Sequence, residues 1–114
     1  MRFESEVVAE ELLPAVRSIL AGKLKDDYGF NQEEIADILD VTQPAVSQYL
    51  NSKRADQSIV SRLQEDPQTG ILLNDMAQQA AKEEKYVQEL QQLVTTVRDK
   101  GMMKEAFSDA ERII

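Results

Sequence analysis

Residues 32–51 read QEEIADILDVTQPAVSQYLN, and this stretch decides the fold because it fits two short helices joined by a tight turn. Asn31, immediately before it, is a favourable N-cap, and Glu34 follows at the spacing of a capping box. Apolar residues then recur at helical spacing, which predicts one buried side for the first helix. That apolar stripe consists of Ile35, Ile38 and Leu39.

The second expected helix follows a turn formed by Asp40 and Val41. Thr42 is a good N-cap, and Pro44 falls in the first helical turn, where its missing N–H costs nothing. The predicted buried face consists of Val46, Tyr49 and Leu50. The face predicted to be exposed consists of Gln43, Ala45, Ser47 and Gln48. Small or hydrogen-bonding side chains of this kind suit a helix that enters the major groove of DNA.

An ordinary antiparallel helix pair is the alternative interpretation, since short amphipathic helices joined by turns are common. Two features favour DNA binding instead. An exposed helix normally carries charged residues, yet residues 42–52 contain none, and Lys53 and Arg54 follow at once. An uncharged face beside two cations is typical of a helix-turn-helix motif, with the second helix reading bases and the cations contacting phosphates.

Residues 13–54, LPAVRSILAGKLKDDYGFNQEEIADILDVTQPAVSQYLNSKR, resemble the small helix-turn-helix regulators found mainly in archaea. That group is similar to the lambda-repressor and Cro-like (XRE-type) fold, and some relatives join it to a thiamine-phosphate synthase-like domain. The most specific part is VTQPAVSQYL, residues 41–50. Asp40 departs from the glycine usual at this turn, but Asp tolerates a left-handed backbone better than most residues.

The resemblance implies a role for each position of the motif. Gln43 and Gln48 would contact base edges, because a side-chain amide can bond adenine at two atoms. Ser47 would reach a base or a phosphate. Thr42, Gln32 and the backbone amides of both helix N-termini would bind phosphates. The DNA backbone beside the groove would be held by Asn51, Ser52, Lys53 and Arg54, with Lys23 or Lys25 as further candidates.

Composition excludes several classes of function. The 114 residues contain no Cys and no His, so a thiolate metal site and the commonest general base are both absent. No phosphate-binding loop or catalytic spacing is present, and we expect neither an enzyme nor a cofactor. No apolar run is long enough for a membrane span, which predicts a cytoplasmic protein. The net charge of -8 predicts weak nonspecific DNA binding.

The chain is predicted to be all-α, with one small domain and an appended helical segment. Residues 1–66 would form the DNA-binding domain of about five helices, with the motif at 32–51. The segment DPQTG, residues 66–70, is rich in turn-forming residues and is the predicted boundary. Residues 71–114 would form a helical dimerisation segment. A short amphipathic helix would close it, outlined by Met103, Ala106, Phe107, Ala110 and Ile113.

The dimerisation segment shows apolar residues in alternating steps of three and four, interrupted only by Glu83. This heptad pattern predicts a coiled-coil-like helix of about 28 residues, about 42 Å long at 1.5 Å per residue. A helix packing back on its own domain is the alternative, but that length exceeds what so small a domain covers. The predicted seam between two subunits consists of Leu73, Met76, Ala80, Val87, Leu90, Val94 and Val97.

The sequence therefore predicts a homodimeric transcriptional regulator that binds double-stranded DNA at specific sites. A second hypothesis is a protein-interaction adaptor, antitoxin-like, in which the motif is only a scaffold. RNA binding is the third, but the motif surface offers only Tyr49 where single-strand readers use several aromatic residues. Any effector, protein or small molecule, is unknown from the sequence.

Overall fold

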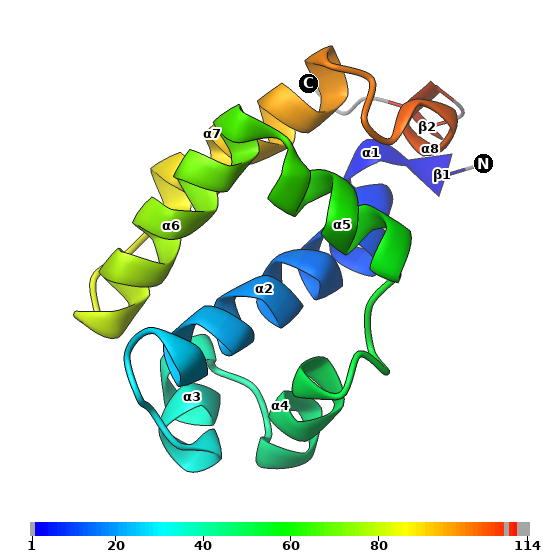
Figure 1. Cartoon of the computed structure of the whole chain (residues 1–114). Coiled ribbons are helices and arrows are strands. Elements are labelled where there is room, and N and C mark those ends of the chain that lie inside the picture. Colours follow the sequence, from blue (N-terminus) through cyan, green and yellow to red (C-terminus); the bar gives the residue numbers. More distant parts are fainter. Residues whose placement is uncertain (1, 109, 112–114) are drawn as a thin grey trace.

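The computed structural model describes residues 2–108 and 110–111 of the chain, and its secondary structure is almost entirely helical (Figure 1), as predicted. The elements are β1 (Arg2–Phe3), α1 (Glu4–Val7), the π-helix η1 (Val8–Leu12), α2 (Leu13–Asp26), α3 (Gln32–Leu39), α4 (Gln43–Leu50), α5 (Gln57–Glu65), α6 (Pro67–Ala81), α7 (Val87–Asp99), α8 (Lys104–Ser108) and β2 (Ala110–Glu111).

Helix α2 is the central element, and it packs against α3, α4, α5 and α6. The helical backbone continues without interruption from α1 through η1 into α2. The widened π turn lies directly before Pro14, which has no N–H and whose ring clashes with the carbonyl four residues earlier in a regular α-helix. The π turn therefore lets a proline lie inside a continuous helix.

Helices α3 and α4 have the predicted caps and turn. The Asn31 backbone N–H donates to the Glu34 carboxylate at 3.0 Å, and the Glu34 N–H donates to the Asn31 side chain at 2.9 Å. Asp40 adopts the left-handed conformation, with φ 55° and ψ 50°. The Ala45 N–H donates to the Thr42 hydroxyl at 3.2 Å. Each helix end thus has its own local partner, which confirms these sequence predictions.

The predicted long C-terminal helix is wrong. The chain leaves the helical conformation after Ala81 and enters it again at Val87, so α6 and α7 fold back on each other. Glu83 adopts a left-handed conformation at this break, with φ 58°. The Glu83 and Glu84 N–H groups then donate to carbonyls of the last α6 turn at 2.9 and 2.8 Å. The alternative of a segment that packs on its own domain describes the fold.

This hairpin divides the predicted seam into two groups. Leu73, Met76, Ala80 and Val97 are buried inside the molecule, each at most 2% exposed. Val87 is 58% exposed, and Leu90 and Val94 are only partly covered. A heptad pattern specifies one apolar side of a helix, but it does not specify whether a second copy or the same chain covers that side.

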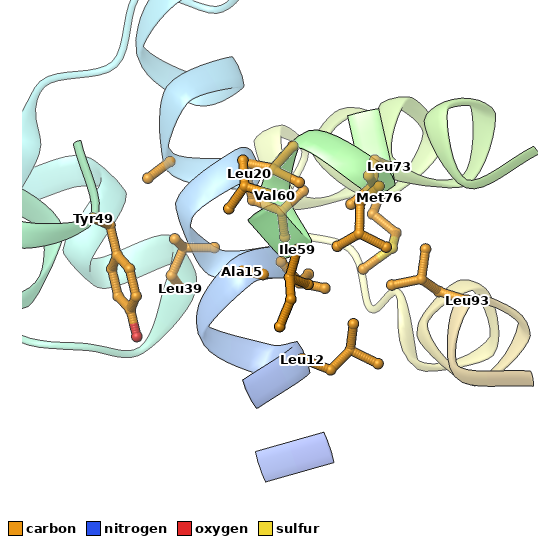
Figure 2. Close-up of a cluster of buried hydrophobic side chains, with 14 of the residues drawn as sticks. Leu12, Ala15, Leu20, Leu39, Tyr49, Ile59, Val60, Leu73, Met76 and Leu93 are labelled. Carbon is orange, nitrogen blue, oxygen red and sulfur yellow. The ribbon is translucent and has the colours of Figure 1, made fainter. Parts of the chain in front are cut away.

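One hydrophobic core runs through both halves of the chain. Figure 2 shows Leu12, Ala15 and Leu20 beside α5, α6 and α7 residues, with Leu93 directed toward the α6 side chains. Full burial of a leucine contributes on the order of 1.5–3 kcal/mol, so removing the C-terminal hairpin would expose a costly surface on α2. The predicted boundary at residues 66–70 is a helix start within this shared core.

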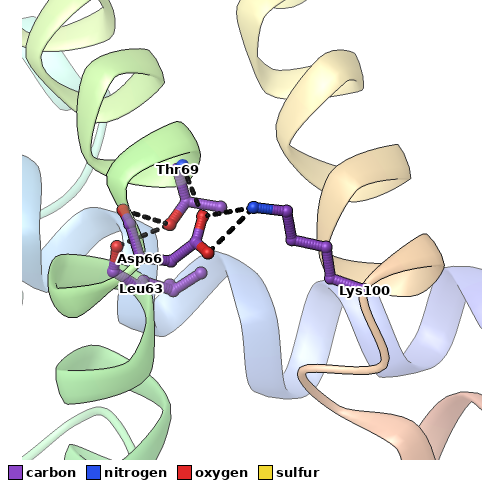
Figure 3. A network of polar contacts seen from close by, with 4 residues as sticks. All are labelled: Leu63, Asp66, Thr69 and Lys100. Carbon is purple, nitrogen blue, oxygen red and sulfur yellow. Dashed lines mark hydrogen bonds and ion pairs between the residues drawn. The ribbon is translucent and has the colours of Figure 1, made fainter.

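The corner between α5 and α6 is fixed by a polar network (Figure 3). The Asp66 side chain accepts from the Thr69 backbone N–H at 2.9 Å and from Lys100 Nζ at 2.9 Å. These two donors, the backbone N–H first, lower the pKa of Asp66. The buried Thr69 hydroxyl donates to the Leu63 carbonyl at 2.6 Å. The network connects the start of α6 to the end of α7.

The two ends of the described chain meet at the edge of the bundle that is remote from α3 and α4 (Figure 1). Strands β1 and β2 pair in parallel, with Arg2 opposite Ala110 and Phe3 opposite Glu111. The last helix, α8, is shorter than predicted, although its Phe107 is buried. Ile113, which the sequence placed on that helix, lies outside the described residues.

Candidate nucleic-acid interface

Helix α4 presents one polar, uncharged face to solvent. Gln43 and Gln48 are exposed, Ser47 is half-buried, and Asn51 lies at the helix end. Residues 43, 47 and 51 lie one turn apart on the same side of the helix. The Asn51 side-chain amide lies within a long hydrogen-bond distance of the Ser47 hydroxyl, 3.5 Å from Nδ2 to Oγ. The structure thus brings Gln43, Ser47 and Asn51 to one side of α4, and Gln48 lies about 100° farther round the helix from Ser47.

The opposite side of α4 faces the core. Ala45, which the sequence predicted to be exposed, is only 4% exposed, as is Tyr49. Ala45 precedes Tyr49 by four residues, so the two side chains lie on the same side of the helix. Leu50, predicted to be buried, is half-buried instead. Burial of Tyr49 also removes the one aromatic ring that could have stacked on a base at this surface.

The central helix holds α4 in place. The Ser18 hydroxyl of α2 donates to the Tyr49 backbone carbonyl at 3.1 Å, and α2 and α4 pack against each other. That carbonyl belongs to the last helical turn, whose carbonyls have no partner within the helix. This contact across 31 residues has no signal in the sequence, and it gives α4 a rigid support.

Arg54 makes two contacts with α4. Its guanidinium Nη1 donates to Gln48 Oε1, and its Cζ lies 5.8 Å from the centroid of the Tyr49 ring. Because arginine has only donors, the accepting atom of Gln48 is its oxygen, and the side-chain NH₂ group is left to face solvent. No sequence pattern links Gln48 to Arg54, and the structure joins them.

The loop after α4 is shaped by its backbone. Ser52 has a φ of 61°, and the Lys53 N–H donates to the Gln48 carbonyl at 2.9 Å, so the helix ends with its last carbonyls satisfied. Asn51, Ser52, Lys53 and Arg54 are all exposed. Asp56 follows as the N-cap of α5, and the Ser58 hydroxyl and N–H, which donate to its carboxylate, lower its pKa.

The cations before the motif are divided between two sides of the molecule. Lys23 and Lys25 line a polar cavity of about 460 Å³ together with Ser52, so they lie near the loop after α4. Asp26 and Asp27 line the same cavity, which reduces its positive potential. Burial raises the pKa of Tyr86, and Arg17, an earlier cation of α2, is close enough to Tyr86 to lower this pKa by a smaller amount. Arg17 therefore does not belong to this interface.

The start of each motif helix offers donors for an anion. The Thr42 hydroxyl accepts the Ala45 N–H, so its own proton is free to be donated outward. Gln32 is half-buried at the first position of α3, on a different helix from the other candidates. The acidic residues of α3 are exposed as well, so phosphates would have to approach α3 by its N-terminal end. Those acidic residues are Glu33, Glu34 and Asp37.

Two other kinds of site were sought among the described residues. They hold no cluster of acidic side chains suited to a metal ion, and none of their helices is long and apolar enough to span a bilayer. Comparisons with protein-family models, curated proteins and solved structures give no match to this chain. The resemblance of residues 13–54 to helix-turn-helix regulators therefore rests on the residues themselves.

Proposed function

We propose that this chain is a sequence-specific DNA-binding transcriptional regulator that acts as a homodimer, with α4 in the major groove. The observation that carries the proposal is the α4 face, in which Gln43, Ser47 and Gln48 form an uncharged polar surface directly beside Lys53 and Arg54. In protein–DNA complexes, hydrogen-bonding side chains contact the bases and cations contact the phosphates beside them. The hydrogen-bonding residues of α4 and the adjacent cations have this arrangement.

The state of Gln48 refines its expected base contact. With one lone pair of its oxygen occupied by Arg54, Gln48 presents its NH₂ donors most freely, and these donors fit the acceptor atoms of guanine or thymine in the major groove. The two-bond contact to adenine also requires the oxygen as an acceptor, and only one lone pair is left for it. That contact becomes more favourable when Arg54 turns away, for example toward a phosphate. Arg54 thus links phosphate binding to base choice.

The charge of the protein limits the mode of binding. With a net charge of -8, the chain has little long-range attraction for DNA, and affinity must come from close contacts at the motif. Weak nonspecific binding favours discrimination between the specific site and other DNA, because the many competing genomic sites then bind less of the protein.

The direct test is selection of bound duplexes from a random pool at moderate salt, followed by a shift assay with the enriched sequence and a scrambled control. The proposal expects an enriched motif that binds at least about a thousandfold more tightly than the control. A pool that remains random after repeated selection would contradict it and would favour the adaptor hypothesis. A matched RNA pool tests the third hypothesis in the same format.

A further inference from the structure

The outer surface of α7 is uncharged, although the chain is rich in charged residues. We call this surface the α7 face and define it by Val87, Leu90, Gln91, Val94 and Thr95. Val87 is 58% exposed, and Leu90 and Val94 are only partly covered. These three residues are the part of the heptad pattern that the intramolecular hairpin leaves on the outside.

Two grooves flank the α7 face. One, of about 630 Å³, lies between α7 and the first helical segment, where Val8, Ala9 and Leu13 form its far wall. The other, of about 640 Å³, lies between α7 and α6, and Ile71, 63% exposed, stands at its wall. Every described residue that lines either groove is uncharged.

We propose that a second copy of this chain docks on the α7 face to form a two-fold symmetric dimer. The first argument is charge. Two copies that each carry -8 repel one another over most of their surfaces, so they can associate closely only where both are neutral. A partner of opposite charge would instead gain most from the acidic surface, which the α7 face lacks.

The second argument is self-complementarity. In a two-fold dimer the same patch must fit itself, so it needs both projections and hollows, and polar groups able to pair with their own copies. The α7 face has exposed Val87 as a projection and a groove on either side, and Ile71 of α6 projects beside it. Gln91 on the face and Gln88 and Gln92 in the groove beside it carry side-chain amides, each both donor and acceptor, so a glutamine can bond its own copy.

The third argument rests on the proposed function. A two-fold regulator contacts half-sites that are one helical turn of DNA, about 34 Å, or a multiple of that distance apart. The molecule measures 38 × 25 × 25 Å, and α4 lies on the side remote from α7 (Figure 1), so the two α4 helices of this dimer would reach half-sites more than one turn apart. Figure 1 shows α7 on the side of α2 away from α3 and α4, so this contact would leave α4 uncovered.

The test adds charge to the α7 face without disturbing the fold. Gln91→Glu combined with Thr95→Glu changes two exposed residues of α7, and glutamate is a good helix former. Ser61→Glu combined with Asn74→Glu is the matched control, because both residues are exposed, neither lines a groove, and the added charge is the same. Sedimentation at micromolar concentration measures the association state, and circular dichroism checks the fold.

We expect the wild type and the control to be dimers, and the α7-face variant to dissociate with a dissociation constant raised on the order of 100-fold. A Gln91→Lys, Thr95→Lys variant should also be monomeric alone, yet pair with the glutamate variant when the two are mixed. A monomeric wild type, or a glutamate variant as dimeric as the control, would overturn the α7-face dimer.

DNA binding separates this proposal from the proposed function. If the wild type is dimeric through the α7 face but enriches no sequence, the dimer stands and the regulator does not. If the wild type binds a selected sequence as a monomer, the regulator stands and the dimer falls. If both hold, the glutamate variant should bind an isolated half-site like the wild type and lose only the added affinity for the full site.

Discussion

The α3–α4 pair and the α6–α7 pair each consist of two consecutive helices in contact, with a left-handed residue in the connection between them, yet only the first pair was predictable. Asp40 has a φ of 55° and Glu83 a φ of 58°. Around Asp40, caps and apolar stripes specify both helix ends within a few residues. Around Glu83, the apolar period continues across the break. A periodic pattern therefore locates a buried face better than it locates a helix end.

The strongest test of this comparison asks whether the two pairs unfold together. Leu93→Ala in α7 and Ile35→Ala in α3 each remove a side chain that is fully buried. Each should lower the free energy of unfolding by about 2–5 kcal/mol, measured by urea denaturation. If one core unites the molecule, hydrogen exchange should accelerate in both pairs for either variant. Gln92→Ala, at an exposed neighbouring position, serves as the control, and local loosening confined to α6 and α7 would argue for separate domains.

The next prediction concerns DNA binding by α4 of the α3–α4 pair. Gln43→Ala and Gln48→Ala should each cost about 1–3 kcal/mol at the selected site and little on scrambled DNA. Lys53→Ala should weaken binding on all sequences and reduce the salt slope by about 1. Arg54→Ala should do the same and also change the base preferred opposite Gln48, because it frees the Gln48 oxygen. Equal losses on all sequences for both glutamine variants would contradict the placement of α4 in the major groove.

The two left-handed residues should respond differently to glycine. Glutamate is strained in this conformation, so Glu83→Gly should stabilise the fold by about 1 kcal/mol. Asp40→Gly should have a smaller effect, because aspartate tolerates the conformation better than most residues. Thermal denaturation of the two single variants measures both shifts. A destabilised Asp40→Gly variant would mean that the Asp40 side chain makes a polar contact that supports the turn.

The smallest expected effect is a change in the stability of the fold at acid pH. Because Thr69 and Lys100 lower the pKa of Asp66 from the ordinary 3.8, its carboxylate stabilises the fold above that value. This contribution is lost as the pH falls through the lower pKa of the folded state. Asp66→Asn keeps an N-cap but has no charge to titrate, so its stability should fall less steeply below pH 3.8. Identical acid profiles for the two proteins would show that this network does not tie α6 to α7.

The features that could be predicted from the sequence are those that depend on interactions between residues close together in the chain. The Asn31–Glu34 box, the Thr42 cap and the left-handed Asp40 each depend on residues at most four positions apart, and all three are present. Ala45 was predicted to be exposed, but it precedes the buried Tyr49 by four residues and therefore lies on the same side of α4. The Ser18–Tyr49 and Arg98–Glu4 contacts join residues that are 31 and 94 positions apart in the chain, and no local sequence pattern predicts them.

The pairing of β1 with β2 also determines where the chain can be attached to something else. Arg2 lies opposite Ala110, so residues 2–3 and 110–111 lie side by side, at the part of the molecule remote from α4 (Figure 1). A fluorophore, surface linker or fused domain at either end would therefore occupy the same neighbourhood. Tethering by one end should leave the α4 face open to DNA. Ends that meet also suit a circular permutant, in which a short linker joins them and new ends open elsewhere.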